Sequence, residues 1–244
     1  MATVRPLAEH GGGTGGGHPG PVHAWVTLAA VAAALCLTLA GCGTRVPKTP
    51  ASTPVSRPDT STASGLAEAM FGTFASVDTT GRGDGIARVP EGVTAALVTA
   101  INEGEGDFAV EAVNSDDEPT ALLVNHIGTY EGTTMYALSQ TPAHLRITAN
   151  GPWKITVSPV ASAKAAGTSI EASGDAAFLY DGPIRSWRVW YGGHFPFTLT
   201  FVTAQQTGTA LDQQAGPVNG VVKGAGGPAV IVVSTYGPWR MIAK

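Results

Sequence analysis

From residue 76 onward, apolar and polar residues alternate in short runs, and glycine, proline or asparagine separates the runs. A period of two is typical of β-strands that bury one face and expose the other. Three runs show this alternation most clearly, and we expect their apolar members to point inward: Phe108, Val110 and Ala112; Leu145, Ile147 and Ala149; Trp153, Ile155 and Val157. Strands do not alternate regularly with helices, which argues against a parallel α/β sheet. The pattern therefore predicts an all-β fold of antiparallel sandwich type.

The strongest signal within this region is self-similarity. The segment 147–155 recurs 86 residues later as the segment 233–241. Further markers recur in the same order: Gly83-Asp84 matches Gly174-Asp175, Phe108 and Val110 match Phe197 and Leu199, and residues 128–132 match residues 216–220. We therefore predict two tandem, jelly-roll-like antiparallel β-sandwich units, at residues 76–160 and 168–244.

Both repeats contain the tripeptide Gly-Pro-Trp, at Gly151-Pro152-Trp153 and at residues 237–239. Glycine permits the positive φ of a tight turn, proline restricts φ, and the tryptophan can open a strand by burying its ring. We interpret the tripeptide as a hairpin turn that sets strand register. Both Trp153 and Trp239 are expected in the core.

The segment 66–77 fits two structures. Leu66, Met70 and Phe74 recur every four residues, as in a helix, whereas alternation from Phe71 to Val77 fits a strand about as well. Both alternatives remain open on sequence alone.

The N-terminal part shows a different pattern. Residues 24–40 are apolar except for two threonines, and the run ends at Leu39-Ala40-Gly41-Cys42. As a helix rising ~1.5 Å per residue, this run falls short of a ~30 Å hydrocarbon core. A short apolar stretch that ends in small residues is typical of a signal peptide. The alternative is a transmembrane anchor that has a cysteine near its boundary by chance.

Residues 39–42 resemble the lipobox of bacterial lipoproteins. The resemblance implies a signal peptide over residues 1–41, recognition of Leu39, Ala40 and Gly41 by the signal peptidase, and a lipid on Cys42. It also implies a protein held by this lipid at the extracytoplasmic face of the cell membrane. Residues 42–70 begin with a stretch rich in Thr, Ser, Pro and Ala, and we predict that they form a disordered linker.

Net charge and cysteine content reduce the number of functions that fit this chain. The formal net charge of −4 argues against a nucleic-acid partner. The two cysteines are Cys36, in the leader, and Cys42, so the mature chain is expected to have no disulfide and no thiolate chemistry. Acidic residues far outnumber basic ones from 77 to 132, and the reverse holds from 133 onward. We favour two solvated faces over a charge-driven partner as the explanation.

Candidate chemistry is sparse. The sequence lacks the nucleophile-elbow and zinc-protease motifs, and His126, His144 and His194 are isolated. The oxygen-rich segment 114–118 does not follow the ligand order of an EF-hand, so a polar turn is favoured over a calcium site. No catalytic residue, cofactor or metal ligand is therefore predicted.

One segment suggests a ligand surface. In a strand, Trp187 and Tyr191 would share one face, and Arg188 and Trp190 the other. A sandwich buries only one of these faces, so an aromatic side chain beside an arginine could be exposed and stack on a sugar ring or a partner. An interface between domains is the favoured alternative.

The repeats resemble small β modules found singly or in tandem in secreted actinobacterial proteins, a resemblance that implies no activity. We expect a membrane-anchored, extracytoplasmic binding or envelope-structural module, with a cell-wall glycan or another envelope protein as partner. A carbohydrate-binding surface protein and a secreted hydrolase with its site between the repeats are the alternatives. A pocket between the repeats, lined by histidine or paired carboxylates, would favour the hydrolase.

Overall fold

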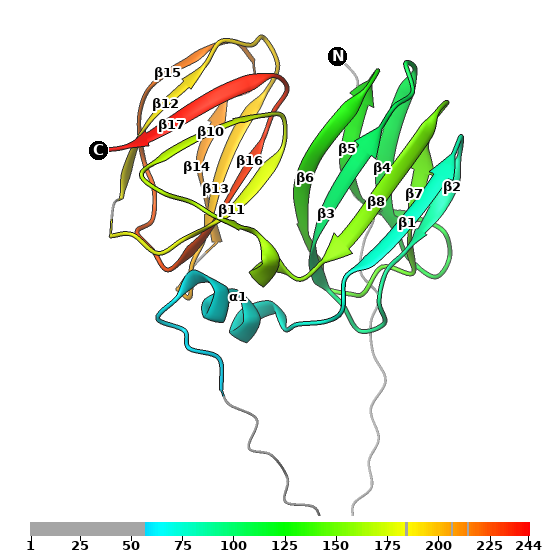
Figure 1. The fold of residues 1–244 in the computed structure, drawn as a ribbon, viewed down its shortest axis with the longest axis horizontal. Helices are drawn as coiled ribbons and strands as arrows, with labels where there is room; N and C mark the ends of the chain where they lie inside the picture. Colours follow the sequence, from blue (N-terminus) through cyan, green and yellow to red (C-terminus); the bar gives the residue numbers. More distant parts are fainter. Residues whose placement is uncertain (1–56, 184, 206, 214) are drawn as a thin grey trace, which may run out of the picture. The chain divides into compact units, whose positions relative to one another are not determined.

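The computed structural model describes residues 57–183, 185–205, 207–213 and 215–244. A helix begins this part of the chain, and strands make up most of the rest (Figure 1). No helix among these residues has the length and apolar character needed to cross a membrane.

The first sandwich contains eight strands: β1 (Val77–Arg82), β2 (Gly85–Arg88), β3 (Ala95–Asn102), β4 (Asp107–Val113), β5 (Pro119–Ile127), β6 (Tyr130–Ala137), β7 (His144–Thr148) and β8 (Pro152–Ser158). They form two four-stranded sheets, with the spatial orders β1-β8-β3-β6 and β2-β7-β4-β5. All pairings in these sheets are antiparallel.

The second sandwich contains these strands: β9 (Lys164–Ala165), β10 (Ser169–Ser173), β11 (Ala176–Tyr180), β12 (Ser186–Tyr191), β13 (Phe197–Val202), β14 (Thr207–Gln213), β15 (Val218–Lys223), β16 (Ala229–Ser234) and β17 (Pro238–Ala243). Its sheets have the orders β10-β17-β12-β15 and β14-β13-β16-β11-β9. The short β9, which precedes the predicted start of the second repeat at residue 168, pairs with β11 in parallel.

The two sandwiches share one strand order. When β1–β8 and β10–β17 are each counted from one to eight, both give one sheet in the order 1-8-3-6 and one in the order 2-7-4-5. Two interleaved sheets of this kind form a jelly roll. The predicted fold class, tandem antiparallel sandwiches of jelly-roll type, is therefore confirmed.

Each sandwich has its own core between its two sheets. The apolar residues predicted to point inward in the three alternating runs, of which Phe108 is the first and Val157 the last, are all buried. Both repeated tryptophans are core residues, with Trp153 5% and Trp239 4% exposed. The alternation therefore identified the inner face of these strands correctly.

The hairpin interpretation of Gly-Pro-Trp is wrong. Strand β7 ends before Gly151 and β8 begins at Pro152, and these two strands lie in different sheets, as do β16 and β17. The tripeptide is a corner that carries the chain from one layer to the other. Gly237 has a positive φ of 83°, but Gly151 is not among the glycines with positive φ. Gly151 is required for another reason, because a side chain there would collide with the backbone of Gly104.

Of the two alternatives left open for residues 66–77, helix α1 (Ala63–Phe71) bears out the helix as far as Phe71. Residues 72–76 belong to neither a helix nor a strand, and β1 begins at Val77. The Thr62 side chain caps the helix by accepting a hydrogen bond from Gly65 N at 3.1 Å, and the helix ends at Gly72, whose φ is 74°. The last part of the predicted 42–70 linker, residues 63–70, is therefore helical and not disordered. Residues 42–56 of that linker lie outside the described residues.

The helix is held by a third apolar cluster. Ala63 and Ala67 pack with Val160 of the short helix η1 (Val160–Ser162) and with residues on the outer face of the second sandwich, among them Leu179 and Val230. Strands β11 and β16 are thus covered on both faces, which explains their consecutive apolar residues.

Candidate functional site

The corner between β1 and β2 and the corner between β10 and β11 have the same local structure. Gly83 and Gly174 have φ values of 70° and 72°. The indole N–H of Trp153 donates to Gly83 O at 2.7 Å, and that of Trp239 donates to Gly174 O at 2.9 Å. Each tryptophan therefore stabilises one corner of its own sandwich through a hydrogen bond. The Gly-Asp pair has a structural role at this corner in both copies.

The aspartates that follow these glycines share one contact, a hydrogen bond that each accepts from a backbone N–H. Asp84 Oδ1 accepts a hydrogen bond from Ala149 N at 3.1 Å, and Asp175 Oδ1 accepts one from Thr235 N at 2.9 Å. Asp175 differs in its second oxygen, because Oδ2 accepts a hydrogen bond from the Tyr130 hydroxyl of the first sandwich at 2.7 Å. The second corner therefore also contacts the first sandwich.

Strand β6 of the first sandwich provides this contact. Thr133 N donates to Asp175 O at 2.9 Å, which gives the corner a second bond to the strand. A Cβ on Gly132 would come within 2.7 Å of Tyr130 Cζ and 3.3 Å of Asp175 O. Glycine at 132 is therefore needed for the close approach, whereas a Cβ on the equivalent Gly220 would meet no atom within 4 Å.

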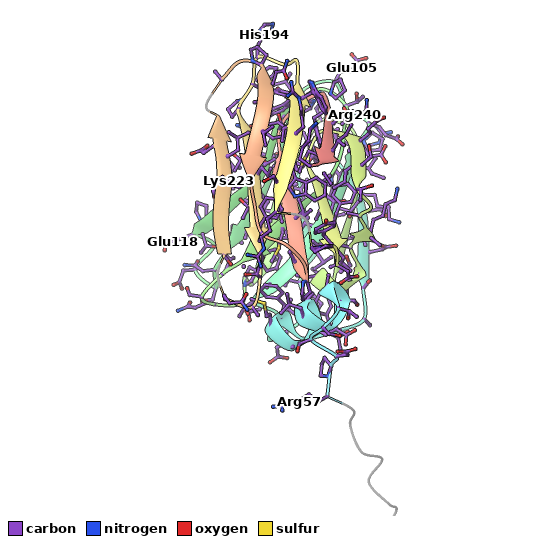
Figure 2. All side chains as sticks on the ribbon, turned by 90° about the vertical axis from the view of Figure 1, so that its left-hand side faces the viewer. Arg57, Glu105, Glu118, His194, Lys223 and Arg240 are labelled. Carbon is purple, nitrogen blue, oxygen red and sulfur yellow. The ribbon has the colours of Figure 1, made fainter. Side chains whose placement is uncertain are left out.

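A row of aromatic rings lies beside this contact. Tyr236 stacks on His126 with ring centroids 5.0 Å apart and an interplanar angle of 17°, and Phe195 lies 4.8 Å from Tyr236. The first sandwich has Asn150 and Gly106 at the matching positions, where Asn150 Oδ1 accepts a hydrogen bond from Gly106 N at 3.1 Å. The second copy has thus replaced a polar contact between two loops with an aromatic one. Figure 2 shows His194, next to Phe195, at this end of the second sandwich.

A groove with a volume of about 710 Å³ opens along these residues, and we call it the first groove. Strands β3, β5 and β6 of the first sandwich and β9–β11 of the second contribute to its walls. Its polar lining consists of hydroxyl groups and charged side chains of both signs: Thr99, Thr129, Thr133, Ser173, Thr235, Glu131, Glu171, Asp175 and Lys164. His126, Tyr130 and Tyr236 supply its aromatic wall.

Of the two tyrosines of this wall, Tyr130 is buried and Tyr236 is half-buried. Burial, and then the neighbouring Asp175 carboxylate, raise the pKa of the Tyr130 hydroxyl, and the same two causes raise the pKa of Tyr236. Because both pKa values lie above the ordinary tyrosine value, both hydroxyl groups are neutral hydrogen-bond donors at neutral pH. His126 Nδ1 is buried and has no hydrogen-bond partner among the described residues.

The predicted ligand surface divides between two environments. Trp187 and Tyr191 are 0% and 2% exposed and belong to the core of the second sandwich, so their assignment to a ligand surface is wrong. Sequence could not decide this, because both faces of β12 carry aromatic residues. Arg188 and Trp190 lie on the outer face, and the Arg188 guanidinium is 5.3 Å from the Trp190 ring centroid.

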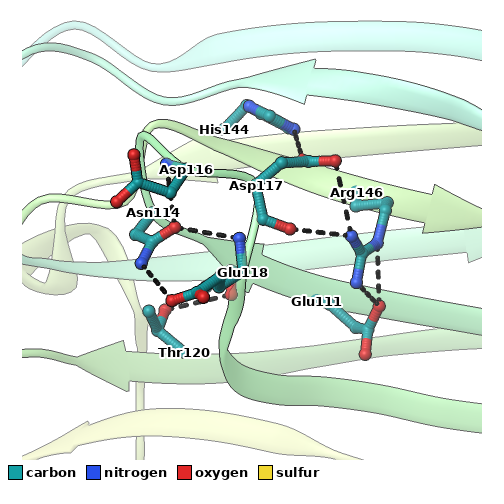
Figure 3. Close-up of polar contacts among 9 residues, drawn as sticks. Glu111, Asn114, Asp116, Asp117, Glu118, Thr120, His144 and Arg146 are labelled. Atoms are coloured by element: carbon teal, nitrogen blue, oxygen red, sulfur yellow. Dashed lines mark hydrogen bonds and ion pairs between the residues drawn. The ribbon is translucent and has the colours of Figure 1, made fainter.

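The oxygen-rich segment 114–118 is a closed polar turn (Figure 3). Asn114 Oδ1 accepts hydrogen bonds from Asp116 N at 3.0 Å and Glu118 N at 2.9 Å. Asp117 pairs with His144 at 3.2 Å and with Arg146 at 3.7 Å, and Arg146 also pairs with Glu111 at 2.8 Å. The side-chain oxygens of Asn114 and Asp117 are thus engaged by other groups of the protein. Across the described residues, no group of three or more His, Cys, Asp or Glu side chains is placed to hold a metal.

The predicted lipidation site Cys42 and the peptidase-recognition residues Leu39, Ala40 and Gly41 lie outside the described residues. Sequence reasoning missed the first groove, because its residues come from strands far apart in the chain. One signal was available: Tyr236 is an aromatic residue where the matching position of the first repeat has Asn150.

Comparisons with known proteins add no functional assignment. No protein-family model matches the chain, and no curated protein matches it. A solved structure that the chain is similar to is the regulatory subunit of a cAMP-independent protein kinase A from Trypanosoma cruzi, bound to guanosine. The two share 8% sequence identity over 69% of this chain and 72% of that one, with a TM-score of 0.19. A similarity this low supports no argument about function.

Proposed function

We propose that the protein is a lipid-anchored, extracytoplasmic carbohydrate-binding protein, and that the first groove receives a neutral sugar. The observation that carries this proposal is the chemistry of the groove wall. Sugars present hydroxyl groups, which both donate and accept hydrogen bonds, and apolar ring faces. The groove offers hydroxyl, carboxylate and ammonium groups beside the rings of His126 and Tyr236.

Charge supports a neutral ligand over an ionic one. The groove contains three carboxylates, but Asp175 is engaged by Tyr130, Ser234 and Thr235. Lys164 supplies a positive charge to the same lining. Charges of both signs along one groove favour neither a strongly anionic nor a strongly cationic ligand.

The sugar proposal is tested by isothermal titration of the full-length protein with the N-acetylglucosamine disaccharide, which is a neutral sugar. Tyr236→Asn places the first-copy residue in the second copy and removes the ring from the wall. We expect this variant to lose roughly tenfold or more in affinity. Asn150→Ala, at the matching position of the first sandwich, is the control and should leave the affinity unchanged. Equal affinity in wild type and Tyr236→Asn would contradict the proposal, as would the absence of binding to wild type.

The lipid anchor is proposed on the lipobox resemblance at residues 39–42, and the two cysteines of the chain provide a matched pair to test it. Metabolic labelling with a fatty-acid analogue should mark the wild-type protein and Cys36→Ser, and should fail to mark Cys42→Ser. Globomycin should leave the first 41 residues attached. A labelled Cys42→Ser variant, or an unlabelled wild type, would refute the anchor.

A hydrolase is a second candidate, because the structure has the groove between the repeats that this alternative requires. Glu131 and Glu171 are the acidic candidates, since both are exposed in the groove whereas Asp175 is bonded through both oxygens. The same oligosaccharides, incubated with the protein and separated by chromatography, should be recovered intact if the protein only binds. Shortened products that disappear with Glu171→Gln would favour the hydrolase.

A further inference from the structure

A second groove, of about 600 Å³, lies on the outer face of the sheet β10-β17-β12-β15. Trp190, Asn219 and Arg240 line it, with Pro217 and Pro238 near the ends of their strands. Glu171 and Ala172 line both this groove and the first groove. The two grooves are therefore neighbours that share part of one wall.

The shared wall is an edge strand. Strand β10 ends its sheet and pairs only with β17 within that sheet. Glu171 is exposed on the outer face of the strand, whereas the Ala172 side chain packs against the core of the second sandwich. A ligand that leaves the first groove over β10 would therefore pass beside the Glu171 side chain, which lines both grooves.

A cross-strand row forms the floor beyond β10. Glu171 lies opposite Arg240, and Trp190 lies between Arg240 and Asn219 in the strand register. Arg240 Nε pairs with Glu171 at 2.8 Å, its guanidinium is 5.8 Å from the Trp190 ring centroid, and Arg188 donates to Asn219 Oδ1 at 3.2 Å. A guanidinium has five N–H donors, so one ion pair leaves donors for a ligand. The row combines an aromatic surface with donors and acceptors, as in the first groove.

The first sandwich lacks this surface. Its matching positions, taken from the strand register, carry Thr80, Lys154, Ile101 and Glu131 in place of Glu171, Arg240, Trp190 and Asn219. Trp190 of the second sandwich is equivalent in register to Ile101 of the first, so only the second sandwich has a tryptophan at this position. The aromatic residue is therefore not required by the jelly-roll fold itself.

We propose that the two grooves are adjoining subsites for one linear neutral glycan chain, which enters the first groove, crosses β10 beside Glu171 and continues over Trp190. This inference rests on the proposed function of the first groove. It makes the ligand a polymer of several sugars, since a single sugar would occupy one subsite only. Two linked subsites raise the affinity for a chain that spans both.

The test is the dependence of affinity on chain length, measured by isothermal titration of the full-length protein. We expect the N-acetylglucosamine hexasaccharide to bind about tenfold or more tightly than the disaccharide. Trp190→Ala should reduce the affinity for the hexasaccharide to that for the disaccharide, and should leave the disaccharide affinity unchanged. Trp190→Phe should restore most of the difference, because it keeps an aromatic ring. Ile101→Ala, at the matching position of the first sandwich, is the control.

Failure of this inference can be told apart from failure of the proposed function. Equal affinities for the two oligosaccharides, or a hexasaccharide affinity that Trp190→Ala does not change, would overturn the extended site and leave the first groove as a single sugar site. If neither oligosaccharide binds, the extended site and the proposed function both fail. Thermal melting of each variant identifies any loss of binding that is due to unfolding.

Discussion

The corners at Asp84 and Asp175 show how one structural element acquires a second role. Both aspartates follow a glycine with positive φ, and both accept a backbone hydrogen bond from the loop before the repeated Gly-Pro-Trp. Asp84 does this on an exposed corner, whereas Asp175 also binds Tyr130 of the other sandwich and borders the first groove. The repeated part specifies the fold, and residues that differ between the copies line the candidate site.

The largest loss of stability is expected at the tryptophan that the two repeats share. Trp153→Ala and Trp239→Ala each remove a buried ring and the hydrogen bond that fastens a corner, so each should lower the free energy of unfolding by about 3–5 kcal/mol. Thermal or urea unfolding measures this. An unchanged melting curve for either variant would show that its tryptophan does not support the core.

The next largest loss of stability should differ between the two aspartates, Asp84 and Asp175. Asp175→Ala removes acceptors for Tyr130, Ser234 and Thr235, and should cost roughly 2–4 kcal/mol. Asp84→Ala removes the acceptor for Ala149 N and should cost about 1 kcal/mol. The comparison fails if chemical denaturation shows equal losses for the two variants.

A smaller effect concerns the close approach of β6 to the second corner. Gly132→Ala should cost about 1–3 kcal/mol, because its Cβ would collide with Tyr130. Gly220→Ala, at the matching position, meets open space and should have little effect on stability. Equal melting temperatures for these two variants would mean that the approach is less tight than described.

The smallest effect is a pH dependence in the first sandwich. Burial raises the pKa of Tyr136 to about 12, above the value of about 10 in an unfolded chain. A raised pKa means that the folded state holds the proton more firmly, so this stabilisation is complete below pH ~10 and is lost as pH rises toward about 12. Unfolding by urea across this range should become easier, and Tyr136→Phe should reduce the change. A stability that stays constant with pH in both proteins would contradict the assignment.

The sequence predicted those features that depend on local patterns. Alternation identified the buried faces of the strands around Phe108, Leu145 and Trp153, and self-similarity identified the two sandwiches. Local pattern could not separate a hairpin from a corner at Gly151-Pro152, since the difference is which sheet β8 joins. It also left helix α1 undecided, because its burial depends on distant residues such as Leu179 and Val230.

The site was beyond sequence reasoning for a related reason. The ring of Tyr236 meets His126, which lies in the other sandwich, so no spacing along the chain relates them. The sequence of β12 makes Trp187 and Trp190 equally good candidates for a ligand surface, and only the fold shows which of the two faces outward. A comparison of the two repeats position by position, at Asn150 and Tyr236, would have given the clearest sequence signal.

The most direct test of the account is to map the binding surface by NMR chemical shifts while the full-length protein is titrated with the N-acetylglucosamine hexasaccharide. Binding in the two grooves should shift the signals of the second corner and its neighbours, residues 171–177 and 235–237, of residues 126–133 of the first sandwich, and of Trp190. Shifts confined to the matching loops of the first sandwich, residues 83–84, 103–107 and 149–151, would contradict it, as would a spectrum that the sugar leaves unchanged.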